Sequence, residues 1–158
     1  MPRGPKYPLE ALGKLRDGAV EAGTRGLAKA VNDRTAAERA QEDAQAARDR
    51  ADAEAARARQ EEAARLARGE QTVADFARAD AWEVAARADA ERHRERVEQA
   101  ALSSQRAHEA EEHARGDLAT RKAEADVVHK DHARWNARQE QRVLANEEQS
   151  AEEAWRRK

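Results

Sequence analysis

Histidines beside carboxylates are the residues of this sequence with the clearest capacity for chemistry. His108 and His113 form one pair, and His129 and His132, on either side of Asp131, form another. Two histidines four residues apart on a helix can bind one metal ion because their side chains share a face. The gaps here are five and three residues, so we expect histidines exposed on a helix surface and no metal site.

Adjacent carboxylates are the second candidate, at Glu147 with Glu148 and at Glu152 with Glu153. Such pairs act as general acid and base only where their surroundings push their pKa values apart. These four lie in a polar segment, which predicts a solvated helix face. The sequence also contains no glycine-rich phosphate loop and no nucleophile motif. We therefore expect a protein that is not an enzyme and has no cofactor.

The elements that carry these residues should be helices. No proline follows Pro8, and 40 of the 158 residues are alanine. Alanine has the lowest cost in an α-helix, glutamate, arginine and glutamine cost little more, and an internal proline would cost roughly 3 kcal/mol. The composition therefore predicts an all-α protein.

Charge and apolar content exclude several classes of protein. The 30 basic and 32 acidic residues nearly cancel, whereas a nucleic-acid binder normally has a basic face. Eight leucines, eight valines and no isoleucine cannot build a compact globular core. No apolar stretch approaches the roughly 18 to 20 residues of a membrane span, and the absence of cysteine is compatible with a reducing compartment. We expect a cytoplasmic protein that binds no nucleic acid and does not insert into a membrane.

Two long helices with one break between them are predicted. Pro2 and Pro5 lie in a flexible start over 1–7, and Pro8 suits the first position of a helix over 8–68. Gly69 can end that helix, and Thr72 with Asp75 forms the signature of a new helix start. We therefore predict a turn over 69–72, a second helix over 73–158 and a single domain over 1–158.

Small residues repeat every three or four positions along both helices, as in a coiled coil. The first row is Ala37, Ala40, Ala44, Ala47, Ala51, Ala55 and Ala58. The second is Val97, Ala100, Ser104, Ala107, Ala114, Leu118, Ala125, Val128 and Trp135, interrupted by Glu111, Arg121 and His132. Because the link near Gly69 is short, the rows predict an antiparallel two-helix coiled-coil hairpin.

The two helices differ in length, so the second should overhang the first. Folding about residue 70 places Tyr7 and Leu9 opposite Trp135 and leaves residues after about 136 without a partner. This end carries apolar groups, including Val143 and Leu144, which is typical of a binding segment. Near the start, a glycine cluster (Gly13, Gly18, Gly23 and Gly26) indicates either close helix packing or a segment that bends against a partner.

The opening YPLEALGKLRDGAVEAGTRGLAKAV, followed by RTAAERA, resembles the start of the FliJ/YscO family, stalk proteins of flagellar and injectisome type III export. Members of the family begin with spaced leucines and an arginine, here Leu9, Leu12, Leu15 and Arg16. A long alanine-rich helix, a glycine-marked turn, an aromatic residue and an end rich in Arg, Gln and Glu follow. Gly69, Phe76 and the terminal RWNARQEQRVLANEEQSAEEAWRRK match these features, over nearly the whole chain.

The resemblance implies a central stalk whose ends enter the channel of a hexameric export ATPase, and a location at the inner-membrane export apparatus. The residues that would contact the ATPase are Leu9, Leu12, Leu15, Arg16, Arg138, Arg142, Trp155 and Arg156. Phe76, with Trp82 and Val84, would contact the export gate protein, although Asp80 replaces the apolar residue that the family has one turn after the aromatic. Export chaperones are a further partner in the family.

Two other interpretations of the sequence remain. The first is a structural coiled-coil spacer or scaffold that dimerises through its alanine row and has no ATPase partner. The second is a single charged helix held by glutamate and arginine pairs four residues apart, such as Glu21 with Arg25. A single helix of that kind does not require the row of valine, leucine and tryptophan.

Overall fold

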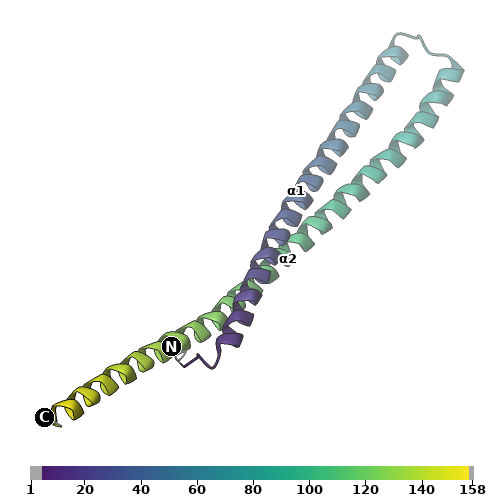
Figure 1. The fold of residues 1–158 in the computed structure, drawn as a ribbon. Coiled ribbons are helices and arrows are strands. Elements are labelled where there is room, and N and C mark those ends of the chain that lie inside the picture. The colour runs from purple at the N-terminus through teal and green to yellow at the C-terminus, as the bar shows by residue number, and fades with distance from the viewer. Residues whose placement is uncertain (1–4, 157–158) are drawn as a thin grey trace. The chain divides into compact units, whose positions relative to one another are not determined.

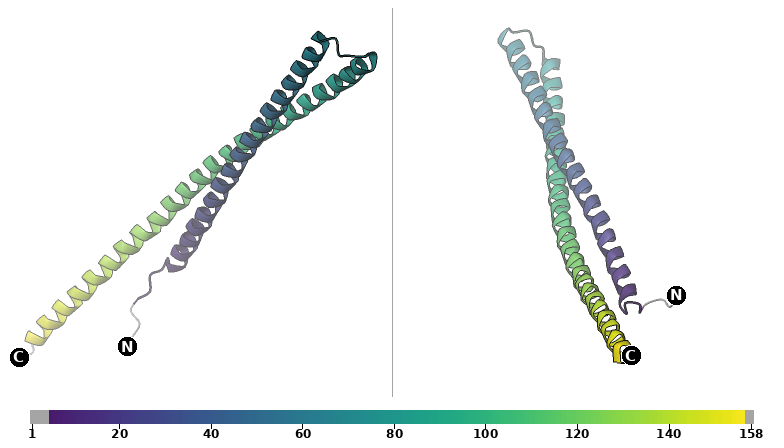
Figure 2. Two further views of the ribbon diagram at one scale, coloured as in Figure 1. Left: turned by 90° about the horizontal axis from the view of Figure 1, so that it is seen from above. Right: turned by 60° about the vertical axis from the view of Figure 1, so that its left-hand side comes forward.

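The protein is a helical hairpin. A computed structural model describes residues 5–156, in which helix α1 (Glu10–Ala67) is followed by helix α2 (Val73–Arg156) and no strand occurs. The helices run antiparallel and pack against each other, as Figure 1 and the two further views of Figure 2 show. The predicted all-α hairpin is confirmed.

The helix bounds differ slightly from the predicted ones. Helix α1 begins at Glu10 rather than at Pro8, because Pro8 and Leu9 form a turn in which the Glu10 N–H donates to the Tyr7 carbonyl oxygen at 3.3 Å. It ends at Ala67 rather than at residue 68. Gly69 has φ of 66°, a left-handed conformation that glycine adopts without strain, and its N–H bonds to the Leu66 carbonyl at 3.0 Å.

Helix α2 starts at a capping box, as its sequence predicted. The backbone N–H of Thr72 donates to the Asp75 carboxylate at 2.8 Å, and the N–H of Asp75 donates back to the Thr72 hydroxyl at 3.3 Å. These bonds satisfy donors that the first turn of a helix leaves free. Bonds from Thr72, and then the bond from Arg78, lower the pKa of Asp75 to about 2.

We expect this cap to weaken in acid. A carboxyl whose pKa is lower in the folded than in the unfolded chain stabilises the fold above its ordinary pKa. The contribution of Asp75 should therefore be lost as pH falls from about 4 to about 2. Amide hydrogen exchange over residues 73–78 measures this loss, and Asp75→Asn should remove its pH dependence. Thr72→Ala should cost about 1 kcal/mol at neutral pH.

Contacts divide the chain into two units, which we describe separately. The terminal unit comprises Met1–Ala28 and His113–Lys158, and the turn unit comprises Lys29–Glu112. In the terminal unit, Leu118, Ala125 and Val128 of α2 are buried together with Tyr7. All three belong to the predicted row, so that part of the row does form the contact face of α2.

One of the four clustered glycines, Gly23, lies at a close approach in the terminal unit. A Cβ atom added at Gly23 would lie 3.2 Å from a methyl carbon of Leu118, and one added at Gly13 would lie 3.6 Å from Val128. Nothing lies within 4 Å of such an atom at Gly18 or Gly26. Close packing therefore accounts for Gly23 only, because a Cβ at Gly13 would make an ordinary contact.

In the turn unit, the alanine row of α1 is half-buried, with one exception. Ala40 is exposed. In this turn of the helix, Ala37 and Gln41 are the half-buried residues instead. On α2, Ser104 and Glu111 are buried among half-buried residues of the predicted row. The contact between the two helices, which we call the seam, is thus made of small side chains with polar groups among them. No helix among residues 5–156 is both long and apolar enough to cross a bilayer.

Candidate binding surfaces

Tyr7, which lies just before α1, packs against α2. Its side chain is 7% exposed, stacks on the His132 ring with a centroid distance of 4.4 Å, and lies 5.6 Å from the Trp135 ring. Its hydroxyl donates to the Asp131 carboxylate at 2.7 Å. We call Tyr7, Asp131, His132 and Trp135 the tyrosine clasp. Sequence analysis placed Tyr7 opposite Trp135, as observed, but assigned it to a flexible start, whereas it is packed.

Burial and the neighbouring carboxylate also change the acidity of this tyrosine. Burial first, and then the hydrogen bond to Asp131, raise the pKa of Tyr7 to about 12. The neutral phenol is favoured because a phenolate would lie beside a carboxylate in a place that water reaches poorly. The clasp therefore holds its donor proton throughout the physiological range.

Polar contacts continue the clasp along both helices of the terminal unit. Arg16, a predicted ATPase contact, pairs with Glu124 of α2. His129 Nε2 lies 2.8 Å from the Asp17 carboxylate. Arg121, which interrupts the apolar row, is half-buried and donates to a backbone carbonyl of α1. The start of α1 is thus held by aromatic packing inside and ion pairs at the edges.

Beyond the clasp, α2 continues without cover. Every residue from 140 to 156, which we call the overhang, is exposed. Figures 1 and 2 show this end of α2 extending past the start of α1. Trp155 is 81% exposed, and Val143 and Leu144 are also largely exposed. The predicted overhang is confirmed, and it begins near the predicted position of about 136.

The residues predicted to contact an ATPase all lie in the terminal unit, on two separate surfaces. Leu9, Leu12 and Leu15 form the first, at the start of α1, where Leu15 is 65% exposed. The second is on α2, where Arg138 and Arg142 are exposed and Arg156 lies 3.8 Å from Glu152. The hairpin therefore brings both groups to one end of the terminal unit.

The residues predicted to contact an export gate lie in the first turns of α2, within the turn unit. Phe76 and Val84 are exposed. The Arg59 guanidinium of α1 lies 5.8 Å from the Trp82 ring and forms two bonds to Glu83, at 2.7 and 3.3 Å. The three residues therefore differ in their surroundings, since Trp82 contacts Arg59 of α1 whereas Phe76 and Val84 are exposed.

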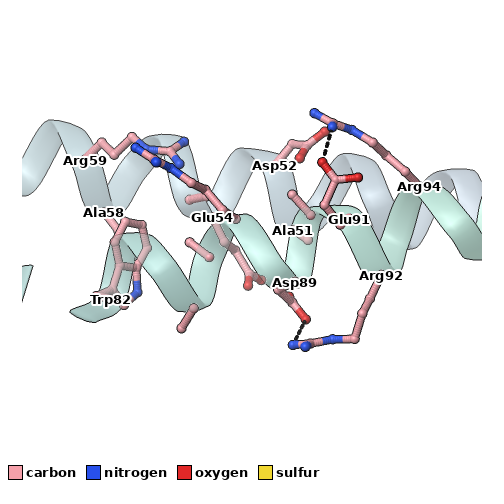
Figure 3. A pocket seen from close by; sticks show the side chains of 15 residues that line it. Ala51, Asp52, Glu54, Ala58, Arg59, Trp82, Asp89, Glu91, Arg92 and Arg94 are labelled. Carbon is pink, nitrogen blue, oxygen red and sulfur yellow. Dashed lines mark hydrogen bonds and ion pairs between the residues drawn. The ribbon is translucent and has the colours of Figure 1, made fainter. Parts of the chain in front are cut away.

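An open groove runs between the helices of the turn unit, and Figure 3 shows its side chains. Its volume is 670 Å³, and six alanines, Trp82 and eight charged residues line it. Charged residues line its rim and pair with one another, including Arg92 with Asp89 at 2.9 Å and Arg94 with Glu91 at 2.5 Å. The groove is thus lined by small side chains between paired charges.

A polar layer that sequence reasoning did not assemble crosses the seam of the turn unit. Glu111 is buried, and its carboxylate lies 2.7 Å from Arg34 Nε without the alignment of a good hydrogen bond. Arg34 also pairs with Glu38, which meets His108 Nε2 at 2.9 Å. The sequence showed Glu111 as an interruption of the row. Its partner could not be predicted, because it depends on which residues face each other across the hairpin.

Comparisons of the chain with protein-family models, with curated proteins and with solved structures found no match. Over residues 5–156, no three side chains of histidine, aspartate or glutamate gather as a group that could hold a metal ion. His108, His129 and His132 instead contact Glu38, Asp17 and Tyr7.

Proposed function

We propose that this protein is the central stalk of a type III export apparatus, and that it binds and stimulates the hexameric export ATPase without chemistry of its own. It would act in the cytoplasm, at the inner-membrane export apparatus. The observation that carries the proposal is the overhang, a helix end of which every residue is exposed although it carries Val143, Leu144 and Trp155. A helix end whose exposed apolar side chains have no internal partner suits insertion into another protein.

The geometry supports a rod tip built from both ends of the chain. The tyrosine clasp holds the start of α1 beside α2, so Leu9, Leu12 and Leu15 lie next to the place where the overhang begins. A channel lined by ATPase subunits could then contact the leucines and, deeper inside, the overhang. The contact would be with protein surfaces, through apolar groups and arginines.

Stimulation would follow from asymmetry. One rod inside a six-fold ring makes different contacts with each subunit, so it favours the nucleotide-bound conformation at some interfaces over others. This requires only that the rod bind the two conformations of a subunit with different free energies. Contacts of Phe76, Trp82 and Val84 with an export gate, and contacts with export chaperones, belong to the same proposal.

The test is a binding and hydrolysis experiment with the export ATPase of the same organism. The tagged full chain should retain the ATPase in a pull-down and raise its steady-state rate of ATP hydrolysis at least several-fold. A matched control is the Leu66→Ser, Val73→Ser variant, because both side chains are exposed beside the turn and neither belongs to the proposed contacts. No retention and no stimulation would contradict the stalk function and favour a structural spacer.

A further inference from the structure

The polar layer in the seam of the turn unit serves none of the contacts proposed above. Arg34 of α1 lies with its Nε 2.7 Å from the carboxylate of Glu111 on α2. His108 Nε2 of α2 lies 2.9 Å from the carboxylate of Glu38 on α1, and Glu38 is also 3.3 Å from Arg34. The Glu111 side chain is only 4% exposed, whereas the other three are more accessible to water. Loss of Arg34 would be most costly for Glu111, because burying a carboxylate requires a paired cation.

The alanines on either side of this layer fit more than one alignment of the helices. Half-buried positions of the turn unit recur every seven residues on both helices. They are Ala30, Ala37, Ala44, Ala51 and Ala58 on α1, and Ala79, Ala86, His93, Ala100 and Ala107 on α2. If α1 moved along α2 by seven residues, alanine would again face alanine at most levels. Alanine packing alone therefore distinguishes poorly between alignments that differ by seven residues.

The polar layer does distinguish between these alignments. A shift of seven residues in one direction places Arg34 opposite Ser104. A shift in the other direction places Gln41 opposite Glu111. Either shift takes the Arg34 guanidinium away from the buried Glu111 carboxylate. A shift also moves the turn and breaks the capping box at its end, but that costs less because the groups of the box are exposed.

We propose that Arg34 and Glu111 set the register of the two helices in the turn unit. Without this pair, the unit should populate a second alignment, shifted by seven residues. Selection of one alignment is the best attested role of buried polar groups in coiled coils, where they can add little stability. The pair would thus hold a seam of nearly uniform alanines in a single conformation. This role belongs to the chain alone, so it does not depend on the stalk function.

The distance between two spin labels tests the register. The chain contains no cysteine, so Ala36→Cys with Ala88→Cys attaches one label to an exposed position of each helix. These positions are about 20 residues apart along the hairpin, so a shift of seven residues should change their distance by roughly 10 Å. The labelled full chain should give one distance. Adding Arg34→Ala with Glu111→Ala should give a second distance in at least roughly a tenth of the molecules, with unchanged helix content by circular dichroism, because alanine favours helix.

Two matched variants separate this pair from other features that could hold the register. Arg59→Ala with Glu83→Ala removes a more exposed ion pair between the helices, at 2.7 Å, and should keep the single distance. Tyr7→Ala opens the tyrosine clasp but leaves the polar layer, and it should also keep the single distance. A second distance in either control would overturn the proposal. A single unchanged distance in the Arg34→Ala, Glu111→Ala variant would overturn it too, and so would a loss of helix content, since the pair would then be needed for folding.

Discussion

Replacing Tyr7 with alanine should free the start of α1 from α2. The substitution removes a buried ring that stacks on His132 and contacts Trp135, and it leaves a cavity that the short segment before Glu10 cannot fill. Amide hydrogen exchange over residues 10–20 should become at least roughly tenfold faster, because local opening no longer has to break the clasp. Exchange in the turn unit should be unchanged.

Two further variants, compared with Tyr7→Ala, distinguish the contribution of the ring from that of the hydroxyl and provide a control. Tyr7→Phe keeps the ring but removes the hydroxyl that donates to Asp131, so it should cause a smaller increase in exchange than alanine. Leu15→Ala is the matched control, because Leu15 is on the same helix end but largely exposed. Exchange that is unchanged in Tyr7→Ala would show that the seam alone holds α1 in place.

The clasp should also open in alkali. The folded chain raises the pKa of Tyr7 to about 12, above its ordinary value of 10.0. A raised pKa means that the stabilising form is the protonated one, present below pH 10 and lost as pH rises from 10 to 12. Tyr7→Phe has no such proton to lose. Its exchange over residues 10–20 should therefore respond less to alkali than that of the unsubstituted chain.

Local signals and periodicity were enough to predict the fold. Gly69 and the pair Thr72 and Asp75 act on their own neighbours in the sequence, so the turn and the start of α2 could be read directly. Helix length could be read in the same way, because no proline interrupts either helix. The overhang then followed, since two helices of unequal length joined by a short turn cannot end together.

Contacts across the hairpin were harder to predict, because they depend on the rotation and register of both helices. Glu111 stood out as a polar residue in the row, but nothing in its own segment identified Arg34 as its partner. Tyr7 was placed near Trp135, whereas its bond to Asp131 required the orientation of a side chain 124 residues away. The surfaces proposed to bind partners were predicted only as exposed segments, because half of any such interface would belong to another molecule.

Removing residues 140–158 should abolish stimulation of the export ATPase while leaving the hairpin intact. The deletion takes away the overhang and keeps Trp135, which the clasp needs, and Gln139, the last half-buried residue of α2. Hydrolysis by the ATPase should fall to its unstimulated rate. The exchange of residues 10–20 in the shortened chain should match that of the full chain, because no described contact of the clasp has been removed.

Point variants identify what the overhang contributes to that stimulation. Leu144→Ser with Trp155→Ser removes two exposed apolar side chains from an otherwise unchanged helix, and it should lower stimulation at least tenfold if the overhang inserts into an apolar channel. Glu147→Gln with Glu153→Gln changes charge without changing size, and it should have a smaller effect because exposed charges contribute little to affinity. Undiminished stimulation by the chain that lacks 140–158 would contradict insertion of the overhang. The leucines of α1, together with Arg16 and Arg138, would then be the remaining candidate contacts, and loss of stimulation in Leu9→Ser with Leu12→Ser would assign the contact to the leucines.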